Sequence, residues 1–268
     1  MPEGPEVRRQ AEFLVESLTG TSIESIELLS GRYTKKPFSG YRDLIEKLPV
    51  SVIGGGVHGK FMYVILGDGS SLQLTLGMTG QWLSKRHKHA RVRLTTNKAD
   101  LFYTDQRNFG TIKWQPSKVN LVAKLKKLGP DIMQSGGKED FIQKIRRKNH
   151  WNICKALMDQ NVVAGIGNYL KAEVLYATAV SPWSQVGELS DNKLELIFES
   201  AGKLAWQSYH SGGATIQSYR NPDGSSGSAS QRFAVYGQEK SICGNPIIRE
   251  KTPDGRTTHW APAVQSEK

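Results

Sequence analysis

The chain has 268 residues and carries 36 Lys and Arg against 25 Asp and Glu, for a formal net charge of +11. This length can bury a sizeable core and predicts two domains, and the excess of positive charge favours an anionic partner, either nucleic acid or a membrane surface. Apolar runs stay below the ~18 residues of a transmembrane helix and the acidic start is unlike a signal peptide, so the sequence gives membrane association little support.

The chain begins MPEGPE, and removal of Met1 would leave Pro2 as a free secondary amine. An α-amino group titrates near ~8, against ~10.4 for a lysine side chain, so about a tenth of it is neutral at pH 7. A neutral secondary amine attacks an aldehyde-like carbon and forms an iminium ion, which withdraws electrons. Glu3 and Glu6 place an acid and a base beside this nucleophile.

A plainer interpretation makes Pro5 and Glu6 ordinary helix-start residues. It explains those two residues and the amphipathic helix predicted over 5–18, with apolar residues on one face. It leaves Pro2 and Glu3 unexplained, at a terminus where chains usually fray.

From about residue 22 to 115, short β-branched or aromatic runs alternate with turn residues, which indicates a β-sandwich or barrel. The predicted strands are Ser22–Leu29, Val50–Val57, Phe61–Leu66, Ser71–Leu76, Ala90–Thr95, Asp100–Tyr103 and Thr111–Trp114.

Residues 118–136 are predicted to form a basic connection, after which the apolar period becomes helical as far as residue 210. The predicted helices are Lys138–Arg147, Trp151–Met158, Asn168–Ala177 and Asp191–Ser211. A Gly- and Ser-rich loop over 220–231 is followed by two strands, Ile242–Lys251 and Arg256–Ala261, joined in a β-hairpin. The fold class is therefore α+β, with a β-sandwich preceding a helical domain.

The segment Gly165-Ile166-Gly167-Asn168 comes directly before the third of these helices. Exposed backbone N–H groups at such a helix start suit a phosphate, with the Asn168 side chain as a further donor. Asn168 could equally be a plain helix cap.

Basic and aromatic residues alternate at three places, Lys60-Phe61, Arg107-Asn108-Phe109 and Lys148-Asn149-His150-Trp151. This mixture suits a surface that neutralises phosphates and stacks on bases. Each place can also be a solvated charged face beside core aromatics.

The chain has two cysteines, Cys154 and Cys243, and neither belongs to a Cys-x-x-Cys pair. Such a count fits a reducing compartment and predicts neither a disulfide scaffold nor a metal site. The pair of histidines at 87 and 89 stands among lysines and arginines and is interpreted as a solvated loop.

Taken together, the motifs of this chain resemble the Fpg/Nei family of bifunctional DNA glycosylases and AP lyases, the formamidopyrimidine-DNA glycosylase and endonuclease VIII-like proteins. They occur in the family's order along nearly the whole chain. The segments that carry the resemblance are MPEGPEVRR, HGKF at 58–61, LGMTG at 76–80, DQRNFG at 105–110, MDQ at 158–160 with GIGNYLKAE at 165–173, and VYG at 235–237.

The resemblance implies four catalytic residues. Pro2 matches the nucleophile that attacks C1′ of the damaged nucleotide, and Glu3 matches the acid that helps to open the sugar ring and moves protons. Glu6 matches the carboxylate that supports the active-site water. Lys60 matches a lysine that contacts the phosphate next to the lesion.

The resemblance also implies five residues that contact DNA. Asn168 matches the phosphate-binding asparagine of the helix-two-turn-helix module. Met78, Arg107 and Phe109 match the residues that fill the gap left by an everted base, since chemistry at C1′ requires the nucleotide to leave the stack. Arg256 matches an arginine at the tip of a finger that grips the phosphate flanking the lesion.

Most members hold zinc in that finger with four cysteines, and this chain departs from the pattern. Only Cys243 matches, while the other three positions fall on Lys240, Ala261 and Val264. One thiol cannot hold tetrahedral zinc. The chain therefore resembles the zincless-finger branch, and apolar packing of residues 242, 247, 248 and 260 is expected to hold the hairpin.

On this resemblance, the expected domains are a catalytic β-sandwich over 1–117, a linker over 118–136, a helix-two-turn-helix domain over 137–220, a flexible lesion-side loop over 221–231 and a zincless finger over 232–268. The expected activity is removal of oxidised bases from duplex DNA and β/δ-elimination at the abasic site through a Schiff base on Pro2. No cofactor and no metal are expected. The protein is expected to act as a monomer on double-stranded DNA with oxidised bases or abasic sites, inside the cell in the nucleus or the nucleoid and cytoplasm.

Three questions stay open in the sequence. A non-catalytic protein that binds damaged DNA on the same scaffold is one alternative, and a basic RNA-binding protein is another. The preferred lesion is the third, because formamidopyrimidines, oxidised pyrimidines, hydantoins and 8-oxoguanine all remain. The residues at 78, 107 and 109 favour the formamidopyrimidine side, whereas the zincless finger favours the Nei-like side.

Overall fold

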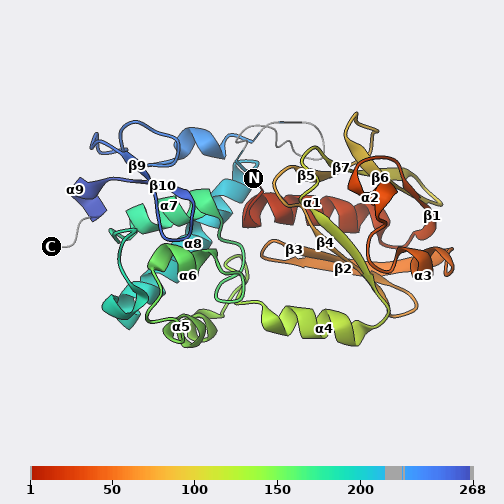
Figure 1. Ribbon diagram of the computed structural model, residues 1–268, viewed down its shortest axis with the longest axis horizontal. Helices are drawn as coiled ribbons and strands as arrows, with labels where there is room; N and C mark the ends of the chain where they lie inside the picture. The colour runs from red at the N-terminus through yellow and green to blue at the C-terminus, as the bar shows by residue number, and fades with distance from the viewer. Residues whose placement is uncertain (1, 215–224, 226, 266–268) are drawn as a thin grey trace. The chain divides into compact units, whose positions relative to one another are not determined.

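The computed structural model describes residues 2–214, 225 and 227–265 (Figure 1). The chain forms two compact units. The first is built mainly from Glu6–Lys126, and the second from Glu3–Pro5, Lys127–Gly213 and the residues from Ser228 onward. Strands dominate the first unit and helices the second, which is the predicted α+β class.

The helix α1 (Gly4–Leu18) supplies one side of the core of the first unit. Its apolar residues Val7, Ala11, Leu14 and Leu18 recur every three or four positions, and all four are buried. This spacing places them on one face of the helix, which packs against the strands. The amphipathic helix predicted from the sequence is confirmed.

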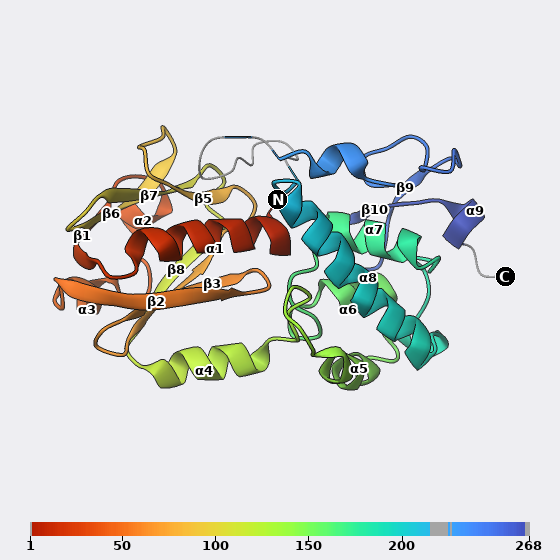
Figure 2. The same cartoon turned by 180° about the vertical axis from the view of Figure 1, so that it is seen from behind.

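Eight strands follow one another in the hydrogen-bonded order β5-β7-β6-β1-β2-β3-β4-β8. Their bounds are β1 (Ser22–Leu28), β2 (Val50–His58), β3 (Phe61–Leu66), β4 (Ser71–Thr75), β5 (Gly80–Leu83), β6 (Ala90–Thr96), β7 (Asp100–Asp105) and β8 (Thr111–Gln115). Only two residue pairs, Ser22 with Ser51 and Ile23 with Val50, join β1 to β2. The strands therefore divide into two groups of four, β5-β7-β6-β1 and β2-β3-β4-β8. Figures 1 and 2 show α1 between the strands β5 to β7 on one side and the strands β2 and β3 on the other.

The pleat of these strands explains which side chains form the core. In β6, buried residues alternate strictly with partly exposed ones. Successive side chains of a strand point to opposite faces of its sheet, so Ala90, Val92 and Leu94 face inward. The seven strands predicted from short β-branched or aromatic runs between turn residues are present, and β5 is the strand that the sequence did not predict.

Three short or basic helices complete the first unit: α2 (Arg32–Lys35), α3 (Tyr41–Ile45) and α4 (Lys118–Lys127). The prediction of a plain connection from residue 118 missed α4. This helix buries Leu121, and its Lys124 ammonium lies 5.6 Å from the ring centroid of Phe61.

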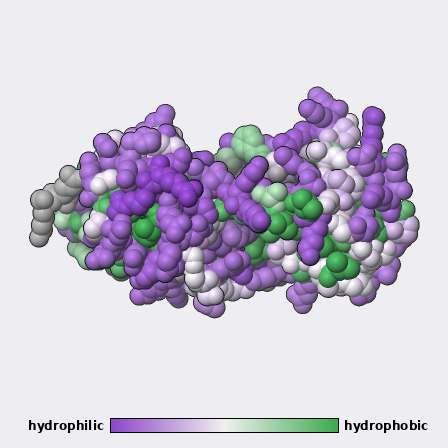
Figure 3. Space-filling view, turned by 90° about the horizontal axis from the view of Figure 1, so that it is seen from below, coloured by the Kyte–Doolittle hydropathy of each residue, from purple (hydrophilic) through white to green (hydrophobic). Residues whose placement is uncertain are grey.

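Figure 3 shows one face of the molecule, on which hydrophilic side chains cover most of the surface and apolar ones form separate patches.

The second unit is helical, with α5 (Lys138–Arg146), α6 (Ile153–Met158), α7 (Asn168–Ala177) and α8 (Asp191–His210), and the short 3₁₀ helices η1 (Val186–Glu188) and η2 (Ala229–Arg232). The residues directly before α6 and α8 cap these helices with their side chains, since Asn152 accepts from Cys154 N and Ser190 accepts from Lys193 N. The helix α7 is the central one, with seven of its ten residues buried. Within residues 2–214, 225 and 227–265, no helix has the length and hydropathy needed to cross a membrane.

The chain ends in an antiparallel hairpin, β9 (Ile248–Lys251) and β10 (Thr257–Trp260), followed by α9 (Pro262–Gln265). The prediction that its first strand begins at Ile242 is wrong, because the chain turns at Gly244, where φ is +81° and the N–H donates to Ser241 O. The expected apolar packing of Ile242 and Ile248 is also wrong. Ile242 is 80% exposed and Ile248 is exposed as well.

Candidate active site

The N-terminal segment is held by a glycine-rich loop of the second unit. Gly4 N donates to Gly165 O over 2.9 Å, and a side-chain carbon at Gly4 would lie 3.3 Å from that oxygen. Pro2 and Glu3 are both buried. The two residues that the sequence singles out thus have a fixed place, although chain termini usually fray.

The Glu3 carboxylate occupies the N-terminus of α7. Gly167 N donates to Oε2 over 2.8 Å, Tyr169 N to Oε1 over 2.8 Å, and Leu170 N to Oε2 over 3.2 Å. The first N–H groups of a helix have no partner within the helix, and the helix dipole there stabilises a negative charge. Glu3 is 1% exposed, so its carboxyl group is hydrogen-bonded by the helix instead of by bulk water.

This arrangement corrects one interpretation of the glycine motif. The sequence offered the backbone N–H groups at the start of α7 to a phosphate. Three of them donate to Glu3. The motif binds the carboxylate next to Pro2, and the Asn168 side chain remains a candidate phosphate ligand.

Gly167 is required here by space and not by backbone conformation. Its φ of −126° is accessible to any residue, but a side-chain carbon would lie 2.3 Å from Cδ of Glu3. We expect Gly167→Ala to displace this carboxylate, to destabilise the second unit by about 1–3 kcal/mol, and to lower base excision by about 10²-fold or more. Melting curves and single-turnover excision measure the two effects.

The control for this variant is Gly187→Ala, in the same unit, where the new carbon would lie 3.2 Å from Asn149 O. Excision by Gly167→Ala at the rate of this control would contradict the assigned role of the glycine.

Glu6 lies in the first turn of α1 and is 1% exposed. Its Oε1 accepts from Ala214 N over 2.7 Å, so this carboxylate holds the chain just before residue 215. Residues 221–224 and 226 of the predicted lesion-side loop over 221–231 lie outside the described residues. Within the same stretch, η2 begins at Ala229.

Lys60 stands in the two-residue turn between β2 and β3. His58 pairs with Phe61 across this hairpin, and Gly59 takes the positive φ of +57° that the first position of such a turn requires. The turn places the lysine at the tip of a stiff hairpin, where its side chain is partly exposed.

Met78, Arg107 and Phe109 belong to two loops whose backbones touch. A side-chain carbon at Gly77 would lie 2.5 Å from Gly110 N, so only glycine fits between the loops. Phe109 is 53% exposed, and the Arg107 guanidinium carbon lies 4.9 Å from its ring centroid. A cation over an aromatic face is attracted to it, so the arginine and the phenylalanine form one projecting pair.

Asp105 fixes the loop that carries Arg107 and Phe109, a role that the sequence did not reveal. It is 1% exposed and accepts from Gly110 N over 2.8 Å and from the Thr79 hydroxyl. The Thr79 hydroxyl oxygen in turn accepts from Arg107 N over 3.0 Å. Burial, followed by the Asp105 charge, raises the pKa of Tyr103 well above its usual value, so Tyr103 remains a neutral donor to Asp105.

Asn168 and Arg256 are brought together by the terminal hairpin. Asn168 Nδ2 donates to Thr257 O over 2.9 Å, which joins the first residue of α7 to the first residue of β10. Arg256 directly precedes Thr257 and is exposed. Two of the predicted DNA-contacting side chains therefore lie on one short stretch of surface.

Glu173 organises the VYG segment, another role that the sequence did not reveal. Its carboxylate accepts from Ala234 N, Val235 N and Tyr236 N over 2.7, 3.0 and 2.8 Å. Burial raises the pKa of Glu173, and these three donors oppose that rise. The segment before the hairpin is thereby attached to α7.

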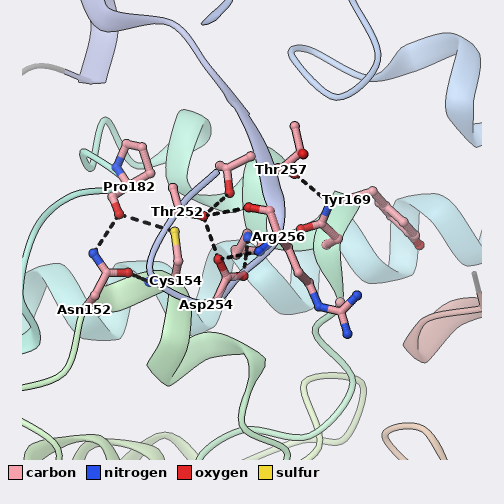
Figure 4. Close-up of polar contacts among 12 residues, drawn as sticks. Asn152, Cys154, Tyr169, Pro182, Thr252, Asp254, Arg256 and Thr257 are labelled. Carbon is pink, nitrogen blue, oxygen red and sulfur yellow. Dashed lines mark hydrogen bonds and ion pairs between the residues drawn. The ribbon is translucent and has the colours of Figure 1, made fainter. Parts of the chain in front are cut away.

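In the described part of the chain, no three His, Cys, Asp or Glu side chains come together to hold a metal ion. Cys154 is buried and its Sγ donates to Pro182 O over 3.4 Å, as Figure 4 shows, whereas Cys243 is exposed. Burial raises the pKa of the Cys154 thiol to about 11.

Because the thiolate is the reactive form, this raised pKa leaves roughly one Cys154 thiol in a thousand as thiolate at pH 8, and burial also keeps reagents away from the sulfur. We expect iodoacetamide to alkylate Cys243 alone in the folded protein and both cysteines after denaturation, as peptide mass spectrometry would measure. Rapid alkylation of Cys154 in the folded state would contradict its burial.

Comparison with known proteins places these features in a family context. The model of the formamidopyrimidine-DNA glycosylase N-terminal domain matches residues 1–112, and that of the H2TH domain of the same proteins matches residues 128–220. A formamidopyrimidine-DNA glycosylase of Prochlorococcus marinus (strain NATL1A) is 31% identical over 99% of this chain and 100% of its own. One from Rhodococcus erythropolis is 32% identical over 94% and 92%.

Solved structures agree with the sequence comparison. A Lactococcus lactis Fpg mutant bound to DNA containing Fapy-dG superposes with a TM-score of 0.87 at 28% identity, covering 99% of this chain and 100% of that one. The MutM (Fpg) protein of Thermus thermophilus gives a TM-score of 0.86 at 27% identity and covers all of both chains.

Proposed function

The chain belongs to the formamidopyrimidine-DNA glycosylase (Fpg/Nei) family, and from that premise we propose how its residues carry out the reaction. The protein is a bifunctional DNA glycosylase and AP lyase that acts on oxidised bases in duplex DNA. The observation that carries the proposal is the buried Glu3 carboxylate at the N-terminus of α7, next in the chain to Pro2.

In the proposed first step the neutral Pro2 nitrogen attacks C1′ and the bond from C1′ to the base breaks. The Glu3 carboxylate takes the proton that the Pro2 nitrogen carries after the attack and delivers it to the ring oxygen O4′; the sugar opens, and the freed nitrogen lone pair forms the iminium bond to C1′. The departing base takes a proton from the water of the site. Glu6 supports the water and the hydrogen bonds of the site, and Lys60 holds the neighbouring phosphate.

The iminium ion is the electron sink for strand cleavage. A proton leaves C2′, the bond from C3′ to oxygen breaks, and the 3′ phosphate departs. A second proton loss at C4′ expels the 5′ phosphate. Hydrolysis then frees Pro2 and leaves a gap of one nucleotide. These steps use only groups of the protein, water and DNA, so we propose that no cofactor takes part.

Five further residues are proposed to hold the duplex. Met78, Arg107 and Phe109 fill the space of the everted nucleotide, and the exposed position of Phe109 supports this role. Asn168 and Arg256 bind phosphates, and their proximity through Thr257 supports a shared stretch of backbone. The DNA-binding protein is proposed to act as a monomer inside the cell, where DNA is.

The non-catalytic alternative predicts binding of damaged DNA without covalent chemistry. Pro2, Glu3 and Lys60 are all present, so the chain retains the residues that such a protein could lose. An RNA-binding protein would bind single-stranded RNA as well as duplex DNA and would nick neither, an outcome that the assay below also separates.

The zincless finger is proposed from the cysteine count, because Cys243 alone stands in the hairpin region. We expect dialysis against a strong chelator to leave excision rate and melting temperature unchanged, since polar side chains hold the hairpin. Single-turnover excision and calorimetry measure this, with a zinc-finger glycosylase as the sensitive control. A loss of activity that zinc restores would contradict it.

The substrate is tested with a panel of duplexes that each carry one lesion opposite each of the four bases. Solved relatives hold DNA with Fapy-dG, a carbocyclic 8-oxoguanine analogue or an oxidised pyrimidine, so these lesions and the hydantoins form the panel. Excision, a one-nucleotide gap with two phosphate ends, and a borohydride-trapped adduct support the proposal. Binding to every duplex without any product would overturn it.

A further inference from the structure

A buried ion pair joins α7 to the tip of the terminal hairpin. Lys171 Nζ lies 2.6 Å from Asp254 Oδ2, and the two side chains are 0% and 3% exposed. Asp254 stands in the turn between β9 and β10, two residues before Arg256. Lys171 stands three residues after Asn168, on the next turn of the same helix.

The other carboxylate oxygen of Asp254 organises the turn itself. Asp254 Oδ1 accepts from the Thr252 hydroxyl over 2.6 Å. Thr252 donates its backbone N–H to Arg256 O over 3.1 Å, and its hydroxyl lies 2.6 Å from that of Thr258. Figure 4 shows these contacts around the turn, with the Arg256 side chain extending away from them.

Asp254 therefore connects two structures at once. One oxygen is bound to α7 through Lys171, and the other is bound to the turn that carries Arg256. The Asn168–Thr257 hydrogen bond spans the same helix and hairpin on the far side of Arg256. The backbone of Arg256 is thus fixed on both sides relative to Asn168.

A gain in the free energy of folding does not explain why such an ion pair is buried. Desolvating two charges can cost as much as their attraction returns, and replacing a buried pair by apolar residues is often neutral or stabilising. A buried pair can, however, specify one arrangement of the groups attached to it. At this place the attached groups are the two proposed phosphate ligands of the second unit.

We propose that Lys171 and Asp254 are positioning residues that hold Arg256 in register with Asn168, so that both side chains grip one stretch of DNA backbone. The inference rests on the proposed phosphate contact of Arg256. Because both side chains of the pair are buried, its proposed effect is on the affinity that Arg256 provides.

The test is a double-mutant cycle in binding. The first background is the native protein, and the second is Lys171→Met with Asp254→Leu, which removes the pair at constant net charge. Arg256→Ala is made in both backgrounds. The dissociation constant is measured for a duplex with a tetrahydrofuran abasic-site analogue between low and moderate salt, and melting curves verify the fold.

The proposal expects Arg256→Ala to weaken binding about 10-fold in the native background and to lower the slope of log Kd against log salt by about 1, because one phosphate contact is lost. In the background without the Lys171–Asp254 pair, the same substitution should weaken binding by less than about 3-fold, since a misplaced arginine contributes little to affinity. A matched control, Lys138→Gln with Glu195→Gln, removes an exposed ion pair of the same unit. In this control background, Arg256→Ala should weaken binding as much as it does in the native protein.

An equal cost of Arg256→Ala in both backgrounds would overturn the positioning role. No cost in either background would instead overturn the phosphate contact itself, so the two failures are distinguishable. If the pair-free protein does not fold, Asp254→Glu replaces it, because it keeps the charge but lengthens the arm by one methylene. A full Arg256 contribution in that variant would equally overturn the proposal.

Discussion

A protein extended by even one residue before Pro2 is expected to form no borohydride-trapped adduct with damaged DNA. Extension turns the terminal amine into an amide, whose nitrogen lone pair is delocalised and does not attack carbon. Losing a covalent nucleophile can cost on the order of 10⁶ in rate, so strand cleavage should fall by at least about 10³-fold. Pro2→Ala keeps a free terminal amine, now a primary one, and is expected to lower trapping without abolishing it.

Trapping and cleavage are measured on an oxidised-base duplex and on a pre-formed abasic site, with the mature N-terminus verified by mass spectrometry. The same extension placed at the other end of the chain is the control. Undiminished trapping with a blocked N-terminus would assign the Schiff base to another amine, and the proposed reaction course would fail with it.

Glu3→Gln is expected to lose base excision by about 10²–10⁴-fold, the usual contribution of a positioned acid or base. Some cutting of a pre-formed abasic site should remain, because its sugar already opens without that proton. Single-turnover rates on the two duplexes separate these effects. Equal loss of both activities would contradict the proposed role of Glu3.

Glu3→Gln is also expected to lower the folding stability, so its melting temperature must be measured together with its activity. The carboxylate accepts three backbone N–H bonds, whereas an amide would turn its own NH₂ group toward one of these donors. An unsatisfied buried donor costs about 1–3 kcal/mol, so the melting temperature should fall. Glu16→Gln, at an exposed site on α1, is the control for losing one negative charge.

Local patterns predicted most of the elements. The α1 face depends on the spacing of apolar residues, and the strands were predicted from short β-branched or aromatic runs between turn residues, so both depend on neighbours in the chain alone. The strand β5 has four residues, too short a run to be recognised, and α4 has charges that outnumber its buried residues. The wrong start of β9 has a different cause, because the Gly-Asn-Pro segment at 244–246 separates Ile242 from the strand.

The candidate site was predicted only in part, for a related reason. Pro2 and Glu3 are neighbours in the chain, so their chemistry could be seen directly. The donors to Glu3 lie 164 or more positions away, and nothing in the spacing of the glycine motif shows that a carboxylate occupies it. Asp105 and the Lys171–Asp254 pair are likewise defined by contacts across the fold. The roles assigned by family resemblance remain predictions that the experiments above test.

Nearly every turn of α7 is committed to a different task. Its start seats Glu3, Lys171 reaches the hairpin, and Glu173 holds the segment before the hairpin. Substitutions in this helix are therefore constrained together. A substitution that shifts α7 to suit one of these three contacts displaces the other two. Tolerated variants should therefore combine several compensating substitutions, and a directed-evolution library of α7 should vary several positions at once.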